Sequence, residues 1–250
     1  MVLLLAAIAG TAWSATEGQC VSSSISSAIV DAPAVLVLGA RRGMQPDHLR
    51  AREVIRRLRR HGDVTLAVDV VTTQGERWHQ QHVANGFGDD VLPLALRWDT
   101  EVSFPWSVYR PLLTNKKIDW VGIGVDNSEM PDPDESVQMP LGIGDRIRNA
   151  SGGHDVPTSR QDSLMRTIAW QEQRMASAAL DAWDGEGYLV VLADRFRVQG
   201  AGGLAWHLER KTDKKVDAYL LAWGFDRCEV NDKVFTWLPF LPLPVVGSAG

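Results

Sequence analysis

One carboxylate stands inside an otherwise apolar segment of the sequence. Asp69 lies within the run 66–71, where every other residue is Leu, Ala or Val. A carboxylate in such a setting must find a partner or take a raised pKa. It is suited either to acid–base chemistry or to an ion pair, for which Arg41, Arg42 and Arg197 are the available arginines. Asp69 is therefore the most informative single residue of the sequence.

Two histidines are spaced so that they adjoin on a helical surface. His79 and His82 are three residues apart, and Glu76 precedes His79 by three. Steps of three drift around a helix by about 60° each, so Glu76 and His82 diverge and do not easily share one ion. We interpret the segment as an ordinary surface helix and predict no metal site. The sequence also lacks a Walker-type phosphate loop and a nucleophile elbow.

Short β-branched runs alternate with helical patterns, which is typical of βαβ units around a mainly parallel sheet. We predict an α/β domain with helices flanking this sheet. The predicted strands are Val35–Leu38, Val64–Val70, Ile118–Val125, Tyr188–Ala193 and Asp217–Trp223. The predicted helices begin near Asp47 and Gln74, lie around Tyr109, and cover 163–183 and 203–210.

Ligands of parallel sheets bind beyond the carboxyl ends of the strands. A glycine and several charged residues stand at or near the ends of the five predicted strands, and these are Gly39, Arg41, Arg42, Asp69, Asp126, Asp194, Arg197 and Asp226. Because the strands are parallel, we expect these ends to meet at one edge. This edge is the predicted ligand site.

The chain divides into three parts. Residues 31–225 form the predicted domain, with an irregular insertion at 126–162 that is rich in Pro, Asp, Gly and Ser. Residues 226–250 form an apolar tail in which the prolines 239, 242 and 244 argue against a helix or a central strand. We expect the tail to pack as an extended strap, or to bind a protein partner through 235–246.

The first 30 residues differ from the rest. Val2 to Ala15 is mostly apolar or small, too short to span a bilayer, and ends in a pattern that signal peptidases favour. No Lys or Arg precedes Arg41, so a basic leader region is missing. We predict a targeting segment or an N-terminal extension, hence an extracytoplasmic or organellar location such as the plastid, with no spanning segment.

The charge of the chain argues against a nucleic-acid binder. The net charge is −5, whereas such proteins carry a clustered basic face and a high pI. Residues 49–60 are a local exception with six arginines, which we interpret as the solvated face of an amphipathic helix or as a site for an acidic partner or a membrane surface. Cys20 and Cys228 are too far apart in sequence to define a disulfide framework.

Several short motifs occur in the order of a known family. The sequence resembles the ChaN-like haem-binding family of the Tiki superfamily. The matching segments are Val35–Gly39 with Pro46–His48, Trp98–Asp99, Phe104–Trp106, Tyr109–Leu113, Glu172–Ala176, Val190–Ala193, Arg197–Val198 and Gly203–Leu208. The resemblance covers roughly 35–223 and implies a ChaN-like domain with a haem or metal-dependent hydrolase site.

The departures from the family fall at its reactive positions. The family has glutamate and histidine after the first strand, where this chain has Ala40 and Arg42, and histidine after the fourth strand, where it has Arg197. The second-strand glutamate is shortened to Asp69. Arginine stays protonated, so it neither ligates a metal nor acts as a general base.

We therefore expect a non-catalytic protein that binds haem or an anionic small ligand. The expected ligand-binding residues are Arg41, Arg42, His48, Asp69, Tyr109, Glu172, Asp194 and Arg197. In this hypothesis Arg42 and Arg197 pair with Asp69, Asp194 or the anion, and Tyr109, His48 or His154 would reach haem iron. The alternatives are a hydrolase in which Asp69 and Glu172 converge, and a structural subunit of a larger assembly.

Overall fold

The computed structural model describes residues 21–22, 33–126, 129, 131–132, 135–151, 157–199, 202–223 and 233–237. Its strands are β1 Val21–Ser22, β2 Ala34–Ala40, β3 Val64–Thr72, β4 Asp119–Gly124, β5 Tyr188–Asp194, β6 Lys215–Trp223 and β7 Lys233–Trp237. Its helices are α2 Gln45–Leu58, α3 Thr73–Ala84, α4 Leu92–Ala95, α5 Trp98–Glu101, α6 Trp106–Leu113, α7 Ile143–Ala150, α8 Thr158–Asp181, α9 Arg195–Val198 and α10 Leu204–Glu209.

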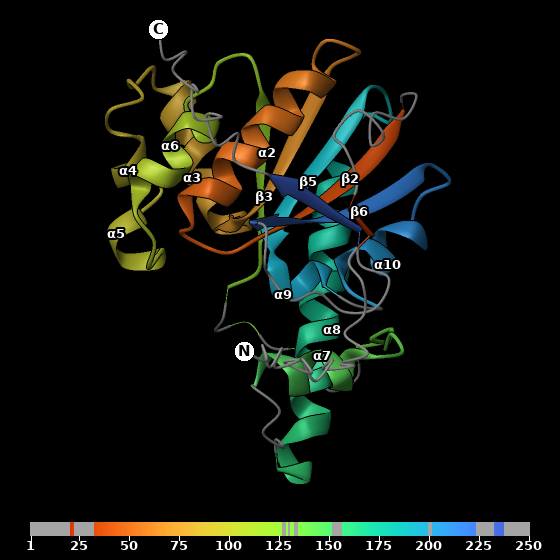
Figure 1. Cartoon of the computed structure of the whole chain (residues 1–250). Helices are drawn as coiled ribbons and strands as arrows, with labels where there is room; N and C mark the ends of the chain where they lie inside the picture. The colour runs from red at the N-terminus through yellow and green to blue at the C-terminus, as the bar shows by residue number, and fades with distance from the viewer. Residues whose placement is uncertain are drawn as a thin grey trace, which may run out of the picture.

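Within these residues the seven strands form one sheet in the order β1-β7-β6-β2-β5-β3-β4, and every paired neighbour is parallel (Figure 1). The α/β class, the five predicted strands and the five predicted helices are confirmed. From β2 the chain continues to β3 and β4 on one side of the sheet. It then returns to form β5 between β2 and β3, and it continues to β6 on the other side of β2. Parallel sheets open a crevice for ligands where the strand order reverses in this way.

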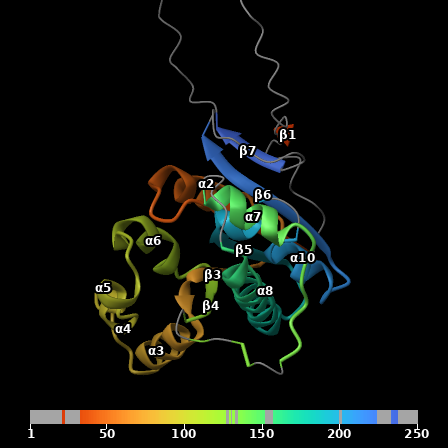
Figure 2. The same ribbon diagram turned by 90° about the horizontal axis from the view of Figure 1, so that it is seen from below.

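Helices cover both faces of the sheet, so its central strands are buried on both sides. Along β2, Leu36 and Leu38 belong to the core beneath α2 and α6, whereas Val35 and Val37 belong to the core beneath α8 and α10. This alternation follows from the two-residue period of a strand. Figure 2 shows α3–α6 on one side of β3 and β4, and α8 on the other.

A bulge interrupts β3 at the residue singled out by the sequence. Val68 pairs with Gly122 and Thr72 with Gly124, so three residues of β3, from Asp69 to Val71, stand opposite one residue of β4. The glycines make this possible, because a Cβ on Gly124 would lie 2.4 Å from the Asp69 carbonyl oxygen. Bulges redirect side chains and are frequent beside functional sites.

The structure corrects two expectations about irregular segments. Residues 126–162 are not irregular throughout, since α7 and the start of α8 lie within them, and α7 lies across α8 (Figure 1). Phe235 to Trp237 belong to strand β7, because the prolines of the tail begin only at 239.

Several predicted features lie outside the described residues. They are the segment Val2–Ala15, Cys20, His154, Asp226, Cys228 and the prolines of the tail. In the described part of the chain, no helix has both the length and the hydrophobicity needed to cross a membrane.

Candidate functional site

The candidate site lies where β2, β5 and β3 reach their carboxyl ends. Ala40 at the end of β2 pairs with Asp194 at the end of β5. On the other side of β5, Leu192 pairs with Val68, which places Asp69 beside the end of β5. Arg42 follows β2 by two residues. The parallel topology thus brings three charged residues from distant parts of the sequence to one edge.

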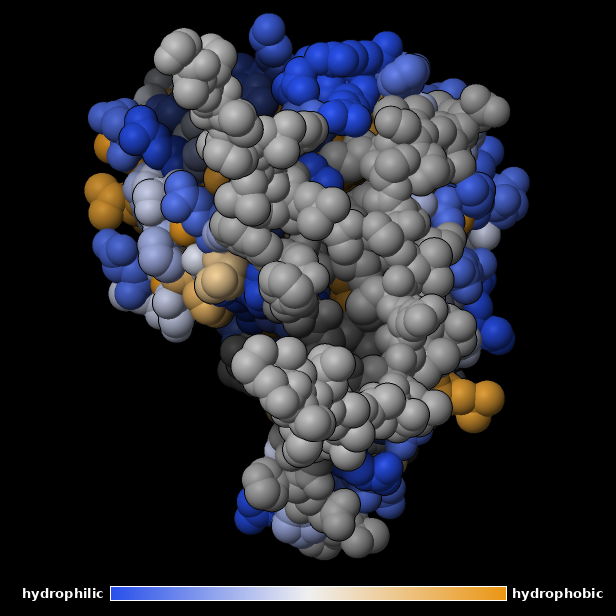
Figure 3. All heavy atoms as spheres, viewed as in Figure 1, coloured by the Kyte–Doolittle hydropathy of each residue, from blue (hydrophilic) through white to orange (hydrophobic). Residues whose placement is uncertain are grey.

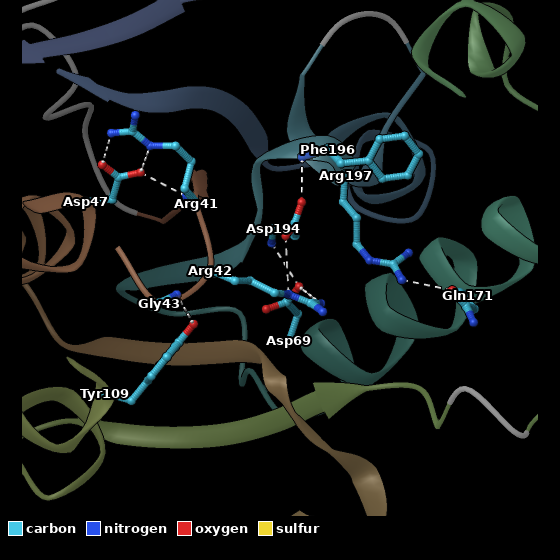
Figure 4. Close-up of polar contacts among 10 residues, drawn as sticks. All are labelled: Arg41, Arg42, Gly43, Asp47, Asp69, Tyr109, Gln171, Asp194, Phe196 and Arg197. Carbon is cyan, nitrogen blue, oxygen red and sulfur yellow. Dashed lines mark hydrogen bonds and ion pairs between the residues drawn. The ribbon is translucent and has the colours of Figure 1, made fainter. Parts of the chain in front are cut away.

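Arg42 joins the two carboxylates of this edge (Figure 4). Its Nη2 donates to Asp69 Oδ2 at 2.8 Å, and its Nε lies 3.3 Å from Asp194 Oδ2. Asp69 Oδ2 also accepts a hydrogen bond from the backbone N–H of Asp194 at 2.8 Å. We call Arg42, Asp69 and Asp194 the strand-end cluster. The ion-pair alternative for Asp69 is the one that the structure contains, and Arg42 is its partner.

The charges of the strand-end cluster support one another. Burial lowers the pKa of Arg42, but attraction to Asp69 and Asp194 outweighs burial, so the pKa is raised above its ordinary value. Burial raises the pKa of Asp194, although Arg42 opposes the rise. The side chain of Asp69 is only 6% exposed and that of Arg42 is 34% exposed. Arg42 therefore stands between a buried carboxylate and solvent.

Asp194 also fixes the next element of the site. Its Oδ1 accepts a hydrogen bond from the backbone N–H of Phe196, which caps the short helix α9. Arg197 projects from α9 toward α8, where its Nη2 donates to Gln171 Oε1 at 2.8 Å (Figure 4). The expected hydrogen-bonded pairing of Arg197 with Asp69 or Asp194 is therefore wrong. α9 directs this side chain to α8 instead.

Arg197 nevertheless has an unused hydrogen-bond donor. Its Nη1 is buried and has no hydrogen-bond partner among the described residues. Burial raises the pKa of both Asp194 and Glu172, and the positive charge of Arg197 opposes the rise in each, so Arg197 lies within electrostatic range of both carboxylates. Arg197 thus stands between the strand-end cluster and α8 with part of its guanidinium free.

The other predicted residues surround the strand-end cluster. Arg41 forms a bidentate ion pair with Asp47, which joins the loop after β2 to the first turn of α2. Tyr109 Oη accepts a hydrogen bond from the Gly43 N–H at 3.3 Å, and the ring of Tyr109 contacts that of His48 edge-on. These contacts hold the loop after β2 against α2 and α6.

His48 and Tyr109 are poorly placed to bind iron. His48 is 2% exposed and its Nδ1 lies 2.9 Å from the Met44 carbonyl oxygen, an acceptor that assigns the ring proton to Nδ1. Burial lowers the pKa of His48 and raises that of Tyr109 to about 12. Tyr109 is 3% exposed. Neither side chain is presented to a ligand as large as a porphyrin.

A small cavity lies among these residues. It is lined by Arg42, His48, Asp69, Tyr109 and Asp194, and its volume is about 10 Å³. This is room for about one water molecule. The cavity itself is too small for a substrate, so a ligand of this edge would meet Arg42 from the solvent side, where its side chain is 34% exposed.

Glu172 forms a second and separate ionic site. Both of its oxygens accept hydrogen bonds from Arg146 of α7 at 2.9 Å, and the two side chains are 0% and 1% exposed. Arg146 also donates to the carbonyl oxygens of Phe196 and Gly202. We call Arg146 and Glu172 the inner pair. Glu172 is committed to this pair and does not join Asp69 as a second catalytic carboxylate.

The histidine helix takes part in packing. His79 stacks on Trp120, Glu76 accepts a hydrogen bond from the Gly122 N–H, and His82 is buried at 6% exposure. α3 is therefore less exposed than an ordinary surface helix. Among the described residues, no three or more His, Cys, Asp or Glu side chains are arranged to hold a metal ion.

Comparison with known proteins identifies the fold. The structure is similar to that of ChaN of Campylobacter jejuni, with a TM-score of 0.63, 16% identity, and coverage of 80% of this chain and 86% of that chain. The chain has a ChaN-like fold. At this identity the likeness concerns fold alone.

Two further structures are more distant. One described as bacterial protein toxins has a TM-score of 0.50 and 13% identity, with 85% of this chain and 39% of that chain covered. RRSP, a toxin effector domain from Vibrio vulnificus, has a TM-score of 0.48 and 13% identity, with 84% and 38% covered. A scan against protein-family models and a search of curated proteins give no match.

Three residues of the site escaped prediction from the sequence. Arg146 was hidden in the segment interpreted as irregular, and Gln171 carries no charge that would have drawn notice. Gly124 shapes the bulge at Asp69. The alternation of Gly122 and Gly124 inside an apolar strand was the available signal, because glycine in a strand often marks a bulge.

Proposed function

We propose that this chain binds an anionic small ligand at the carboxyl edge of its sheet, through Arg197 and Arg42. The observation that carries the proposal is the buried Nη1 of Arg197, which lacks a hydrogen-bond partner among the described residues. A buried charged donor without a partner is costly. A carboxylate or phosphate oxygen at this position would gain a charge-assisted hydrogen bond.

The same residues argue against hydrolysis at this edge. Arginines stand where the ChaN-like family has histidines, and a guanidinium neither binds a metal nor accepts a proton. Asp69 is occupied by two hydrogen bonds to one oxygen. Glu172 is held by both of its oxygens in the inner pair. Each of these two carboxylates is thus already paired with an arginine.

Ligand-induced stabilisation tests the proposal. The purified chain is melted with increasing inorganic phosphate or succinate, for the wild type, Arg197→Gln and Arg195→Gln. Arg195 lies in the same short helix, so the control has the same change of charge. A ligand at 100 times its Kd stabilises by about 2.7 kcal/mol, which raises the Tm by about 5 to 10 °C. We expect this rise in the wild type and Arg195→Gln only. An equal rise in Arg197→Gln, or no rise in any variant, would refute the assignment.

Haem is the second candidate, because the chain shares its fold with ChaN, whose structure is described as showing cofacial haem binding. Of the expected iron ligands, His48 and Tyr109 do not fit axial ligation because both side chains are buried, and His154 lies outside the described residues. The site does fit the porphyrin's carboxylates, which are anions of the kind that Arg197 and Arg42 would bind.

Spectroscopy separates iron ligation from anion recognition. The chain is titrated with haem and, in parallel, with iron-free protoporphyrin. Anion recognition predicts that both porphyrins bind with similar affinity and that Arg197→Gln weakens both. Saturable binding of haem alone, with a shifted Soret band that survives Arg197→Gln, would favour an iron ligand and contradict our assignment of the arginines.

A further inference from the structure

A groove lies between α2 and α6, away from the strand ends. Its volume is about 320 Å³, which is far larger than that of the cavity at the strand-end cluster. Ile55, Leu112 and Ile118 form its apolar floor, and all three are buried. Leu49 lies at its rim with 51% of its surface exposed. Leu49 is therefore the apolar side chain of this groove that a bound partner would cover.

Arginines line one wall of this groove. Arg52, Arg56 and Arg59 are exposed on the same side of α2. Glu53, the acidic residue of the wall, accepts hydrogen bonds of 2.6 to 2.8 Å from Arg56 and Arg57. Among the described residues, no ion pair or hydrogen bond engages the side chains of Arg52 and Arg59. Hydrophilic side chains gather over the C-terminal end of α2, at the top of Figure 3.

We propose that this groove binds an acidic amphipathic helix of a partner protein. The groove carries a net positive charge although the whole chain has a net charge of −5, so its charge selects an acidic occupant. The apolar floor requires apolar side chains from the same occupant. Amphipathic helices that lie in grooves combine these two features.

The spacing of the arginines sets the spacing of the partner's acids. Arg52 and Arg59 are seven residues apart, which is about two turns or about 10.5 Å along α2. A helix that lies alongside α2 would meet both arginines with carboxylates seven residues apart. Its leucines or isoleucines would then face Leu49 and the floor. A recessed groove suits such a helix better than a flat anionic membrane does.

A designed peptide tests this inference. The probe is a fluorescein-labelled helix of about 15 residues, with glutamates seven residues apart and leucines on the adjoining face, and its anisotropy is followed on the full chain. A peptide with glutamines in place of the glutamates is the matched ligand. Arg59→Glu and Arg60→Glu are the matched variants, because the residues are adjacent and exposed and only Arg59 lines the groove. Circular dichroism confirms that each variant folds.

We expect saturable binding of the glutamate peptide, at least tenfold weaker binding of the glutamine peptide, and a similar loss in Arg59→Glu. Arg60→Glu should bind within twofold of the wild type. Equal losses in the two variants would mean diffuse charge attraction and overturn the assignment. Absence of peptide binding would also overturn the assignment of the groove. So would binding of the chain to phosphatidylserine vesicles that the peptide does not compete with.

Discussion

The inner pair and the strand-end cluster are both built from arginine and carboxylate side chains, but their surroundings differ. The inner pair, Arg146 with Glu172, is enclosed by α7 and α8 and is at most 1% exposed. The strand-end cluster includes Arg42, whose side chain is 34% exposed. Both of the Glu172 oxygens are satisfied by one guanidinium, whereas Arg42 is shared between two carboxylates.

Exposure decides what each site can do. A buried ion pair such as Arg146–Glu172 is structural, because removing one partner leaves the other charge buried and unpaired. A pair at the rim of a sheet is screened by solvent and can exchange partners at lower cost. The inner pair therefore holds α7 against α8, and the strand-end cluster is the site where a ligand can compete for an arginine.

The largest expected effect follows from breaking the inner pair. Arg146→Met leaves Glu172 buried and unpaired, so we expect the free energy of unfolding to fall by about 3 to 5 kcal/mol. Urea denaturation measures the change. The double variant Arg146→Met/Glu172→Met should recover most of the loss, because it removes both charges. A loss below about 1 kcal/mol in Arg146→Met would show that the pair is not structural.

A smaller effect is expected at the bulge that positions Asp69. In Gly124→Ala the new Cβ would lie 2.4 Å from the Asp69 carbonyl oxygen. This is a backbone atom, so no side-chain rotation can relieve the clash. We expect a loss of about 1 to 3 kcal/mol in urea denaturation. Gly144→Ala is the control, since its Cβ would have ordinary contacts inside α7. The control should be neutral or stabilising, and equal losses in both variants would refute the role of the bulge.

The comparison explains which parts of the structure the sequence predicts. The runs of β2, β3 and β5 are apolar because both faces are buried, so they stand out in the sequence and place Arg42, Asp69 and Asp194 at strand ends. Their convergence then follows from parallel topology. Which arginine pairs with Asp69 does not follow from the topology, because it depends on the direction of each side chain. The sequence contains three arginines that could pair with Asp69. Only the geometry of the loop after β2 shows that Arg42 is the partner.

The inner pair was beyond prediction for a different reason. Arg146 lies in a segment whose glycines, prolines and aspartates suggest a loop, and α7 exists there because Ile143 and Ile147 pack with Ala169 of α8. Tertiary packing thus stabilises a short helix that composition alone does not favour. For this reason the sequence alone does not show that Glu172 is paired with Arg146.

Removing Arg42 should cost less than removing Arg146. Arg42→Met leaves Asp69 with the hydrogen bond from the Asp194 N–H, and solvent reaches the rim of the site. We expect a loss of about 1 kcal/mol in urea denaturation. The double variant Arg42→Met/Asp69→Asn should restore stability. A loss as large as that of Arg146→Met would erase the distinction between the two sites.

A further expected effect is a pH dependence of stability caused by His207. Burial lowers the pKa of His207 to about 4, and Arg146, Lys211 and Arg210 add to this decrease. The unfolded chain takes up the proton near pH 6.5, whereas the folded chain does so only near pH 4. The contribution of His207 to stability is therefore full above pH 6.5 and is lost as the pH falls from 6.5 to 4.

Substitution of the histidine isolates this dependence. His207→Leu should flatten the stability profile between pH 6.5 and 4 in urea titrations, relative to the wild type. His61→Gln is the matched control, because His61 is exposed and should leave the profile unchanged. Unaltered slopes in His207→Leu would show that another group causes any loss at low pH.

The most direct test of anion binding follows the arginine side chains themselves. In ¹⁵N–¹H NMR spectra of the labelled chain, the guanidinium signals are assigned by substitution and recorded during a phosphate titration. We predict saturable shifts of the Arg197 and Arg42 signals and none for Arg146, which is enclosed and paired with both oxygens of Glu172. A stationary Arg197 signal, or equal shifts for Arg197 and the exposed Arg60, would contradict the proposed binding site.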